Sequence, residues 1–229
     1  MGAPEVISWM PSRFTVILAL SAAAGALDAI AYFELGRIFV ANMTGNTVLG
    51  AGLILAGKWG AAGRHLVTVA TFVAGVIGAR LVVVRLGSRP GDGLPQNRRI
   101  AACLASSACL VAAGTILAAA LRGALVPMFA FCLGAQNAVL TRWGSATFNT
   151  SFITGNLEKL GESVAQFGNQ PGGSDDKSRF QAAVSGGIWL SYFLGAAAGG
   201  GLSRVFHTNG FLFPALLLVG AAVVVTRAG

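Results

Sequence analysis

Charged residues are scarce in this chain. Asp, Glu, Lys and Arg make up 10% of its 229 residues, whereas a soluble globular domain carries about 25%. The mean hydropathy is +0.71, and several apolar runs reach the ~20 residues that cross a bilayer as a helix. The scarcity of charge therefore excludes an ordinary soluble domain and predicts an all-α integral membrane protein.

Residues for enzymatic or metal chemistry are also few. The chain has two histidines and eight acidic residues, and it lacks the HExxH, GxSxG and Gly-Lys-Ser motifs of common enzyme classes. Its three cysteines, Cys103, Cys109 and Cys132, lie in apolar runs without disulfide or metal-site spacing. We therefore expect no enzyme activity, no cofactor and no metal.

The sixteen basic residues outnumber the eight acidic ones and give a formal net charge of +8. They fall in short loops between apolar runs rather than along one face, which is typical of the positive-inside bias of membrane proteins. The expected partner is therefore the lipid bilayer and not a nucleic acid.

Six apolar runs are long enough to predict membrane spans within a single membrane domain, residues 1–229. The runs are Phe14–Phe33, Leu66–Val84, Ile100–Leu121, Ala124–Trp143, Gln181–Val205 and Phe211–Val225. If the polar loop Arg85–Arg99 and both termini are cytoplasmic, ten Lys and Arg residues lie inside and five outside. Two additional spans would change these numbers to seven and eight, so the positive-inside rule favours six spans.

An internal duplication organises these spans. The segment Gly25–Gly50 is repeated as Gly134–Gly161, so that Asp28 aligns with Asn137 and the tripeptide Thr-Gly-Asn occurs in both copies. Repeat one covers about residues 13–90 and is completed by the span 100–121, and repeat two covers about residues 124–229. Three spans per repeat is an odd number, so the sequence predicts two inverted three-helix repeats, an arrangement found in many secondary transporters.

Each Thr-Gly-Asn turn is expected to lead into a short half-helix or an interfacial helix. Thr44 and Thr154 are candidate N-caps, Gly45 and Gly155 allow close approach of backbone or ligand, and Asn46 and Asn156 offer donors and acceptors. The helix after Thr154 is amphipathic, which favours the membrane interface. The two turns are interpreted either as the lining of a polar path or as simple re-entry points at the membrane surface.

Asp28 is the one acidic residue well inside a predicted span, about 14 residues into the first. A buried carboxylate in a membrane needs a partner and often marks an ion or proton site. The alternative is structural, with Asp28 accepting hydrogen bonds from backbone amides at the start of the Thr-Gly-Asn helix. Asn137 at the equivalent position favours the structural interpretation, because an amide cannot carry a proton.

The spacing of Gly25, Asp28 and Ala29 to Phe39 and Thr44-Gly45-Asn46 resembles the YoaK-type family of bacterial transmembrane proteins, and so does Phe148 with Thr154-Gly155-Asn156. The resemblance extends from about Phe14 to Arg227. It implies a multi-pass protein of the bacterial inner membrane, but it implies no activity, because the family has no established one to carry over.

Two functions follow as hypotheses. The first is a small-solute transporter or channel with a polar path between the repeats. Its candidate path residues are Asp28, Thr44, Gly45, Asn46, Gln136, Asn137, Thr154, Gly155 and Asn156. The alternative is a membrane-embedded accessory or assembly protein that binds a partner protein. Gly195 and Gly199 form a GxxxG pair, which predicts either packing within the chain or a homo-oligomer through that face.

Overall fold

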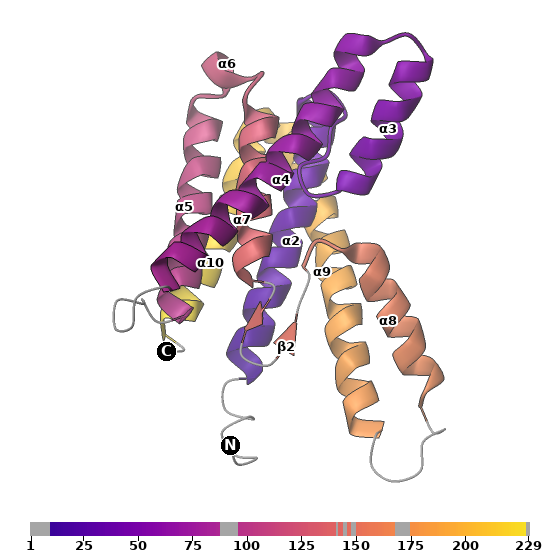
Figure 1. Ribbon diagram of the computed structural model, residues 1–229, viewed down its shortest axis with the longest axis vertical. Coiled ribbons are helices and arrows are strands. Elements are labelled where there is room, and N and C mark those ends of the chain that lie inside the picture. The colour runs from indigo at the N-terminus through magenta and orange to yellow at the C-terminus, as the bar shows by residue number, and fades with distance from the viewer. Residues whose placement is uncertain are drawn as a thin grey trace.

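The computed structural model describes residues 10–87, 96–140, 142–143, 146–147, 150–167 and 175–227. Apart from one two-stranded ribbon, the regular elements in this part of the chain are helices (Figure 1). In chain order they are α2 (Met10–Glu34), α3 (Met43–Leu55), α4 (Trp59–Gly87), α5 (Gln96–Ile116), α6 (Ala118–Leu121), α7 (Leu125–Leu140), β1 (Arg142–Trp143), β2 (Ala146–Thr147), α8 (Ile153–Ala165), α9 (Asp175–Phe206), the 3-10 turn η1 (His207–Phe211) and α10 (Leu212–Arg227).

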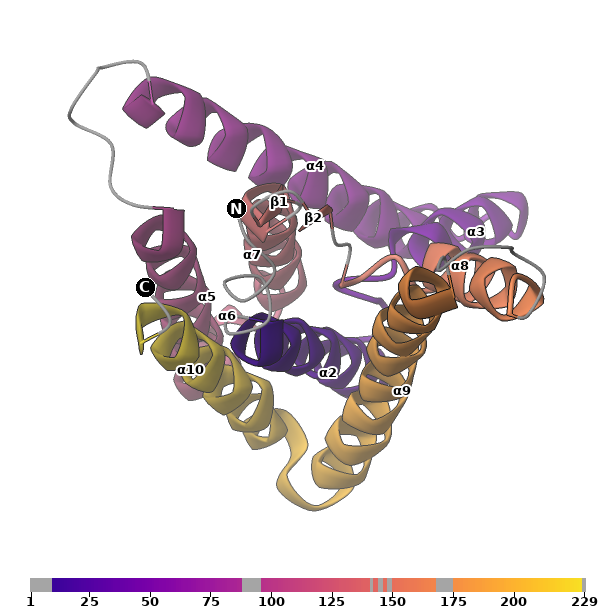
Figure 2. The same ribbon diagram turned by 90° about the horizontal axis from the view of Figure 1, so that it is seen from below.

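Four helical stretches are long and apolar enough to cross a membrane: Phe14–Glu34, Trp59–Val82, Arg98–Ile116 and Ser178–Arg227. The last of them changes direction at η1, so α9 and α10 run along different axes (Figure 2). Shorter apolar helices cover Met43–Leu55 and Leu125–Ala138. The chain is therefore a helical membrane protein.

Several expected boundaries were wrong, and the expected span Ile100–Leu121 is divided into α5, which begins at Gln96 and ends at Ile116, and α6. The fourth apolar run was expected to be helical as far as Trp143, but α7 ends at Leu140 and Trp143 lies in the short strand β1, opposite Ala146. The helices α4 and α9 begin earlier than their apolar runs, at Trp59 and Asp175. The polar residues there form first helical turns rather than loops, because hydropathy alone does not report where a helix starts.

The closest helix contacts pass through glycines. In the crossing of α2 and α9, a Cβ on Gly25 would collide with the backbone of Tyr192. In the crossing of α4 and α7, a Cβ on Gly134 would collide with the backbone of Phe72. Membrane helices use such small residues to approach closely, so these two crossings fix how the long helices pack.

The Gly195 and Gly199 face packs within the chain. Both residues lie on α9 against α2, where added Cβ atoms would meet Ala22 and Ala26. In the described part of the chain, α2 therefore packs against this face.

Two helical hairpins extend toward opposite ends of the molecule, α3–α4 at one end and α8–α9 at the other (Figure 1). The helix α3 ends where Lys58 N donates to Leu53 O at 2.8 Å and Gly57 N to Ile54 O at 2.9 Å. Gly57 has φ of 70°, the left-handed conformation that closes this type of turn. A buried core lies between α2, α5, α7, η1 and α10 and includes the ring pair Phe129 and Phe211, and Phe72 of α4 and Tyr192 of α9 pack against it.

Candidate functional site

A cleft of about 1450 Å³ lies between the two hairpins. Its lining comes from α2, α4, α7 and α9 and from the residues at the starts of α3 and α8. Both starts lie toward the middle of the long axis of the molecule, and the two helices run from there to opposite ends (Figure 1). Both Thr-Gly-Asn segments thus reach one space, which is called the central cleft below.

Asp28 holds the chain that leads into α3. Its Oδ1 accepts hydrogen bonds from the backbone N–H groups of Val40 and Ala41, both at 2.6 Å, and its Oδ2 accepts from that of Asn42 at 3.0 Å. The Tyr192 hydroxyl donates to the same Oδ2 at 2.5 Å. Asp28 is 2% exposed and acts as acceptor in all four bonds. This geometry matches the structural interpretation of Asp28.

The physical need for Asp28 follows from the backbone it binds. The segment before α3 is not helical, so its N–H groups have no partners within a helix. Non-helical backbone inside a membrane protein is tolerated only when other groups satisfy it. A carboxylate supplies several acceptor positions at one point, and a single side chain can therefore hold three consecutive amides.

Asn46 holds the same segment from the other side. Its Nδ2 donates to Phe39 O at 2.7 Å, and its Oδ1 accepts from Phe39 N at 3.0 Å. The His65 ring nitrogen Nδ1 lies 3.1 Å from the same Oδ1 and ties the segment to α4. Asn46 is fully buried. Its amide therefore reproduces the pairing of a backbone ladder where the chain has none.

The N-cap prediction was wrong in both copies. The N-cap of α3 is Asn42, whose side chain accepts from Gly45 N at 2.9 Å, and Thr44 lies inside the helix. The N-cap of α8 is Phe152, which makes no side-chain cap bond, and Thr154 again lies inside the helix. Asn is at least as good an N-cap as Thr. Asn42 stands three residues before Gly45, whose backbone N–H lies in the first turn of α3 and takes the Asn42 side chain as its acceptor.

In the second Thr-Gly-Asn segment, the amide of Asn137 stands where the first segment has the carboxylate of Asp28. Asn137 Nδ2 donates to the hydroxyl of Ser151 at 2.7 Å, and Asn156 Nδ2 donates to Phe152 O at 2.9 Å. Asn137 thus reaches the chain before α8 as Asp28 reaches the chain before α3. The two copies share a role, the support of a non-helical lead-in, and differ in charge.

The candidate path residues fall into two groups. Five line the central cleft, and they are Asp28, Thr44, Gly45, Asn137 and Thr154. The other four, Asn46, Gln136, Gly155 and Asn156, are buried away from its lining. Within the described part of the chain, Gln136 Oε1 has no hydrogen-bond partner. The sequence therefore identified the two turns that reach the cleft, but it did not separate the residues that line the cleft from those that only support the turns.

Three residues of the cleft were missed as site residues. Tyr192 binds Asp28 across 164 positions of sequence, and no local pattern predicts that pairing. Arg80 and Arg204 also line the cleft. In the sequence they count only as charges near the ends of spans. The sequence could have identified Arg80 and Arg204 by one feature, which is that each is a charged residue within a long apolar helix, α4 or α9.

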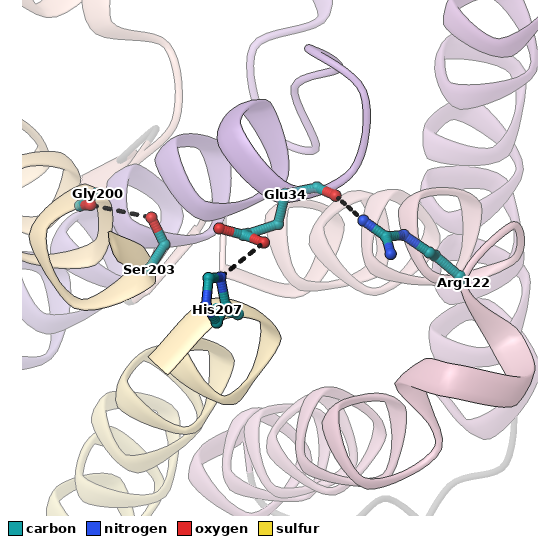
Figure 3. A network of polar contacts seen from close by, with 5 residues as sticks. All are labelled: Glu34, Arg122, Gly200, Ser203 and His207. Carbon is teal, nitrogen blue, oxygen red and sulfur yellow. Dashed lines mark hydrogen bonds and ion pairs between the residues drawn. The ribbon is translucent and has the colours of Figure 1, made fainter. Parts of the chain in front are cut away.

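A second polar network fixes the end of α2 (Figure 3). The Glu34 carboxylate lies 3.7 Å from the ring of His207 at the start of η1, and Arg122 donates to the Glu34 backbone oxygen at 3.0 Å. Ser203 donates to Gly200 O at 2.9 Å in the last part of α9. These contacts join α2, the α6–α7 connection and the α9–η1 corner at one end of the molecule.

The chain matches known proteins over most of its length. Residues 16–224 match the family described as "Protein of unknown function (DUF1275)", and the chain belongs to this family. The "UPF0700 transmembrane protein YoaK" of Bacillus subtilis (strain 168) is 29% identical over 161 residues, which cover 67% of this chain and 68% of that protein. No solved structure matches the chain. The resemblance inferred from the Thr-Gly-Asn motifs is thereby confirmed.

Proposed function

We propose that this DUF1275 protein is a small-solute transporter or channel whose path passes through the central cleft. The observation that carries the proposal is that the lead-ins to α3 and α8 reach one cleft from separate parts of the chain. Interrupted backbone at membrane depth is characteristic of solute sites in secondary transporters. A solute there can be met by backbone groups and by Thr44 and Thr154 without breaking a regular helix.

The proposal includes six spans arranged as two inverted repeats. Each of the six expected apolar runs overlaps one of α2, α4, α5, α7, α9 and α10. The helix contacts support the repeat, because α2 crosses α9 at Gly25 and its counterpart α7 crosses α4 at Gly134. The hairpins α3–α4 and α8–α9 extend toward opposite ends, as an inverted pair requires (Figure 1).

The proposed topology has a direct test. We place the protein in the bacterial inner membrane with both termini in the cytoplasm. After replacement of the native cysteines, Lys58→Cys at the α3–α4 turn and Gln166→Cys at the end of α8 should react with an impermeant thiol reagent from opposite sides of the membrane. Labelling of both positions from the same side would rule out the inverted arrangement.

The transport proposal is tested by flux through proteoliposomes. A panel of labelled solutes is followed across vesicles that contain the protein, the variant Thr44→Trp or the variant Thr154→Trp. Both variants put a large ring into the cleft and should abolish flux. Gly52→Trp is the matched control, because a Cβ added at Gly52 on α3 would meet nothing within 4 Å beyond its own helix. The proposal fails if no solute moves, or if the cleft variants transport as well as the control.

A second candidate is an accessory protein that binds a partner within the membrane. It is supported by α8, whose Leu157 and Val164 are exposed although α8 packs on α9, and by the exposed Phe167 just after its end. A partner recovered at fixed stoichiometry after mild solubilisation, and lost on Val164→Ser, would favour this function. Solute flux by the protein alone would favour transport.

A further inference from the structure

The central cleft carries positive charge with apolar walls. We infer that it takes an organic anion, a carboxylate or similar group on an apolar body, with the guanidinium of Arg80 or of Arg204 as its binding group, because the two arginines lie in the C-terminal parts of α4 and α9 and thus toward different ends of the cleft. This inference rests on the proposed transport function and adds the chemical class of the solute.

The lining of the cleft has more positive than negative charge. Asp28, Arg80 and Arg204 are the charged residues that line the cleft in the described part of the chain. The carboxylate of Asp28 already accepts three backbone N–H groups and the Tyr192 hydroxyl. The Asp28 carboxylate is therefore occupied by the lead-in to α3. The guanidinium groups of Arg80 and Arg204 remain as the charges in the cleft lining that no opposite charge neutralises.

The two arginines lie on membrane helices without a partner in the described part of the chain. Arg80 is the 22nd of the 29 residues of α4, and Arg204 lies in the last turn of α9. Neither guanidinium makes an ion pair or hydrogen bond with the residues that the structure describes. Charged groups within membrane helices are costly unless they are paired or hydrated. An anion in the cleft supplies that pairing, and guanidinium binds carboxylates through two parallel hydrogen bonds.

The walls of the cleft decide which kind of anion fits. Aromatic rings line it, from Tyr32, Phe33, Phe39, Phe72, Phe152 and Tyr192. The rings of Tyr32 and Phe39 stack with centroids 5.1 Å apart and form a flat apolar surface. The volume of about 1450 Å³ exceeds the roughly 300–1,000 Å³ of ordinary ligand pockets. A small inorganic ion would leave these walls uncovered, whereas an organic anion covers them.

Three solutes of nearly equal shape test the charge preference: benzoate, benzyl alcohol and benzylamine. Their binding to the full-length protein in nanodiscs of zwitterionic lipid is measured by calorimetric titration. Benzoate should bind at least about tenfold more tightly than benzyl alcohol, since a charge-assisted hydrogen bond contributes at least that much. Arg80→Gln and Arg204→Gln combined in one protein should remove most of this preference, whereas Arg80→Lys and Arg204→Lys combined should keep part of it.

Arg64→Gln is the matched control, because it removes one positive charge from α4 without changing the lining of the cleft. Equal binding of the three solutes, or an equal loss with Arg64→Gln, would overturn the inference. So would displacement of benzoate by anionic phospholipid added to the nanodiscs, because the anion would then be a lipid headgroup. Thermal unfolding of each variant identifies any loss of binding that comes from misfolding. If the glutamine variant misfolds, the lysine variant, which keeps the positive charge, shows whether the preference for benzoate depends on that charge.

Flux measurements separate this inference from the transport proposal. If neutral or cationic solutes move and anions do not, the inference falls while the proposed function stands. If benzoate binds through either arginine but no solute moves, the anion site stands and the transport proposal falls.

Discussion

Asp28 is predicted to stabilise the fold rather than to carry a proton. In Asp28→Ala, the N–H groups of Val40, Ala41 and Asn42 lose their acceptor. An unsatisfied buried polar group costs about 1–3 kcal/mol, so three of them cost about 3–9 kcal/mol. Water that enters from the adjacent cleft recovers part of this, and we expect a net loss of about 3–5 kcal/mol.

Asp28→Asn is the more informative variant. The amide oxygen can still accept from Val40 and Ala41, but the amide nitrogen would face the N–H of Asn42, two donors in contact. The loss of one acceptor and of the charge should cost about 2–3 kcal/mol. Thermal unfolding in detergent should then occur about 4–12 °C lower, at about 2–4 °C per kcal/mol for a chain of this size.

Two further variants, Tyr192→Phe and Asn137→Ala, test the partner of Asp28 and its counterpart in the second segment. Tyr192→Phe removes one hydroxyl bond to Asp28 and should cost about 1–2 kcal/mol. Its effect should largely vanish in the Asp28→Asn background, because the bond it removes is then already weakened. Asn137→Ala, at the equivalent place in the second copy, should cost less than Asp28→Ala. The reasoning is refuted if Asp28→Asn leaves the unfolding temperature unchanged and abolishes pH-dependent flux, since Asp28 would then act by titration.

The remaining predictions concern close packing and backbone support. Gly25→Ala and Gly134→Ala should each destabilise the protein by at least about 1–3 kcal/mol in thermal unfolding, because the new Cβ meets backbone that cannot move aside. Gly52→Ala has open space and should be neutral or slightly stabilising; an equal loss at all three glycines would contradict the crossing geometry. Asn46→Ala removes both bonds to Phe39 and should cost about 2–4 kcal/mol, measured by the same method, and an unchanged unfolding temperature would contradict the support role of Asn46.

The long helices were predictable because hydrophobic length is a local property. Each expected apolar run overlaps a helix, since a bilayer-length segment satisfies its own backbone bonds only in that form. The ends of the helices were less predictable. Arg64 and His65 precede the expected apolar run Leu66–Val84, yet both lie within the first turns of α4. His65 is buried against Asn46, a tertiary contact that hydropathy does not report.

The site was predictable only as far as the repeat identified it. The two Thr-Gly-Asn segments were recognised from their duplication, and both reach the central cleft. Within each segment, sequence could not tell a lining residue such as Thr44 from a support such as Asn46, because they stand two residues apart and only the helix register separates them. Tyr192 and Arg204 come from α9, far along the chain, and their role depends on the glycine-mediated crossing of α9 with α2.

The difference between the copies has a mechanical consequence. Both lead-ins are held by an asparagine amide, Asn46 before α3 and Asn156 before α8, but only the lead-in to α3 is also held by a carboxylate, that of Asp28, through charge-assisted bonds. Charge-assisted hydrogen bonds are roughly twice as strong as neutral ones. Loss of the Asp28 charge is therefore expected to loosen the start of α3 through all three of its backbone bonds at once, so that the unfolding temperature and the shape of the cleft should change together in Asp28→Ala.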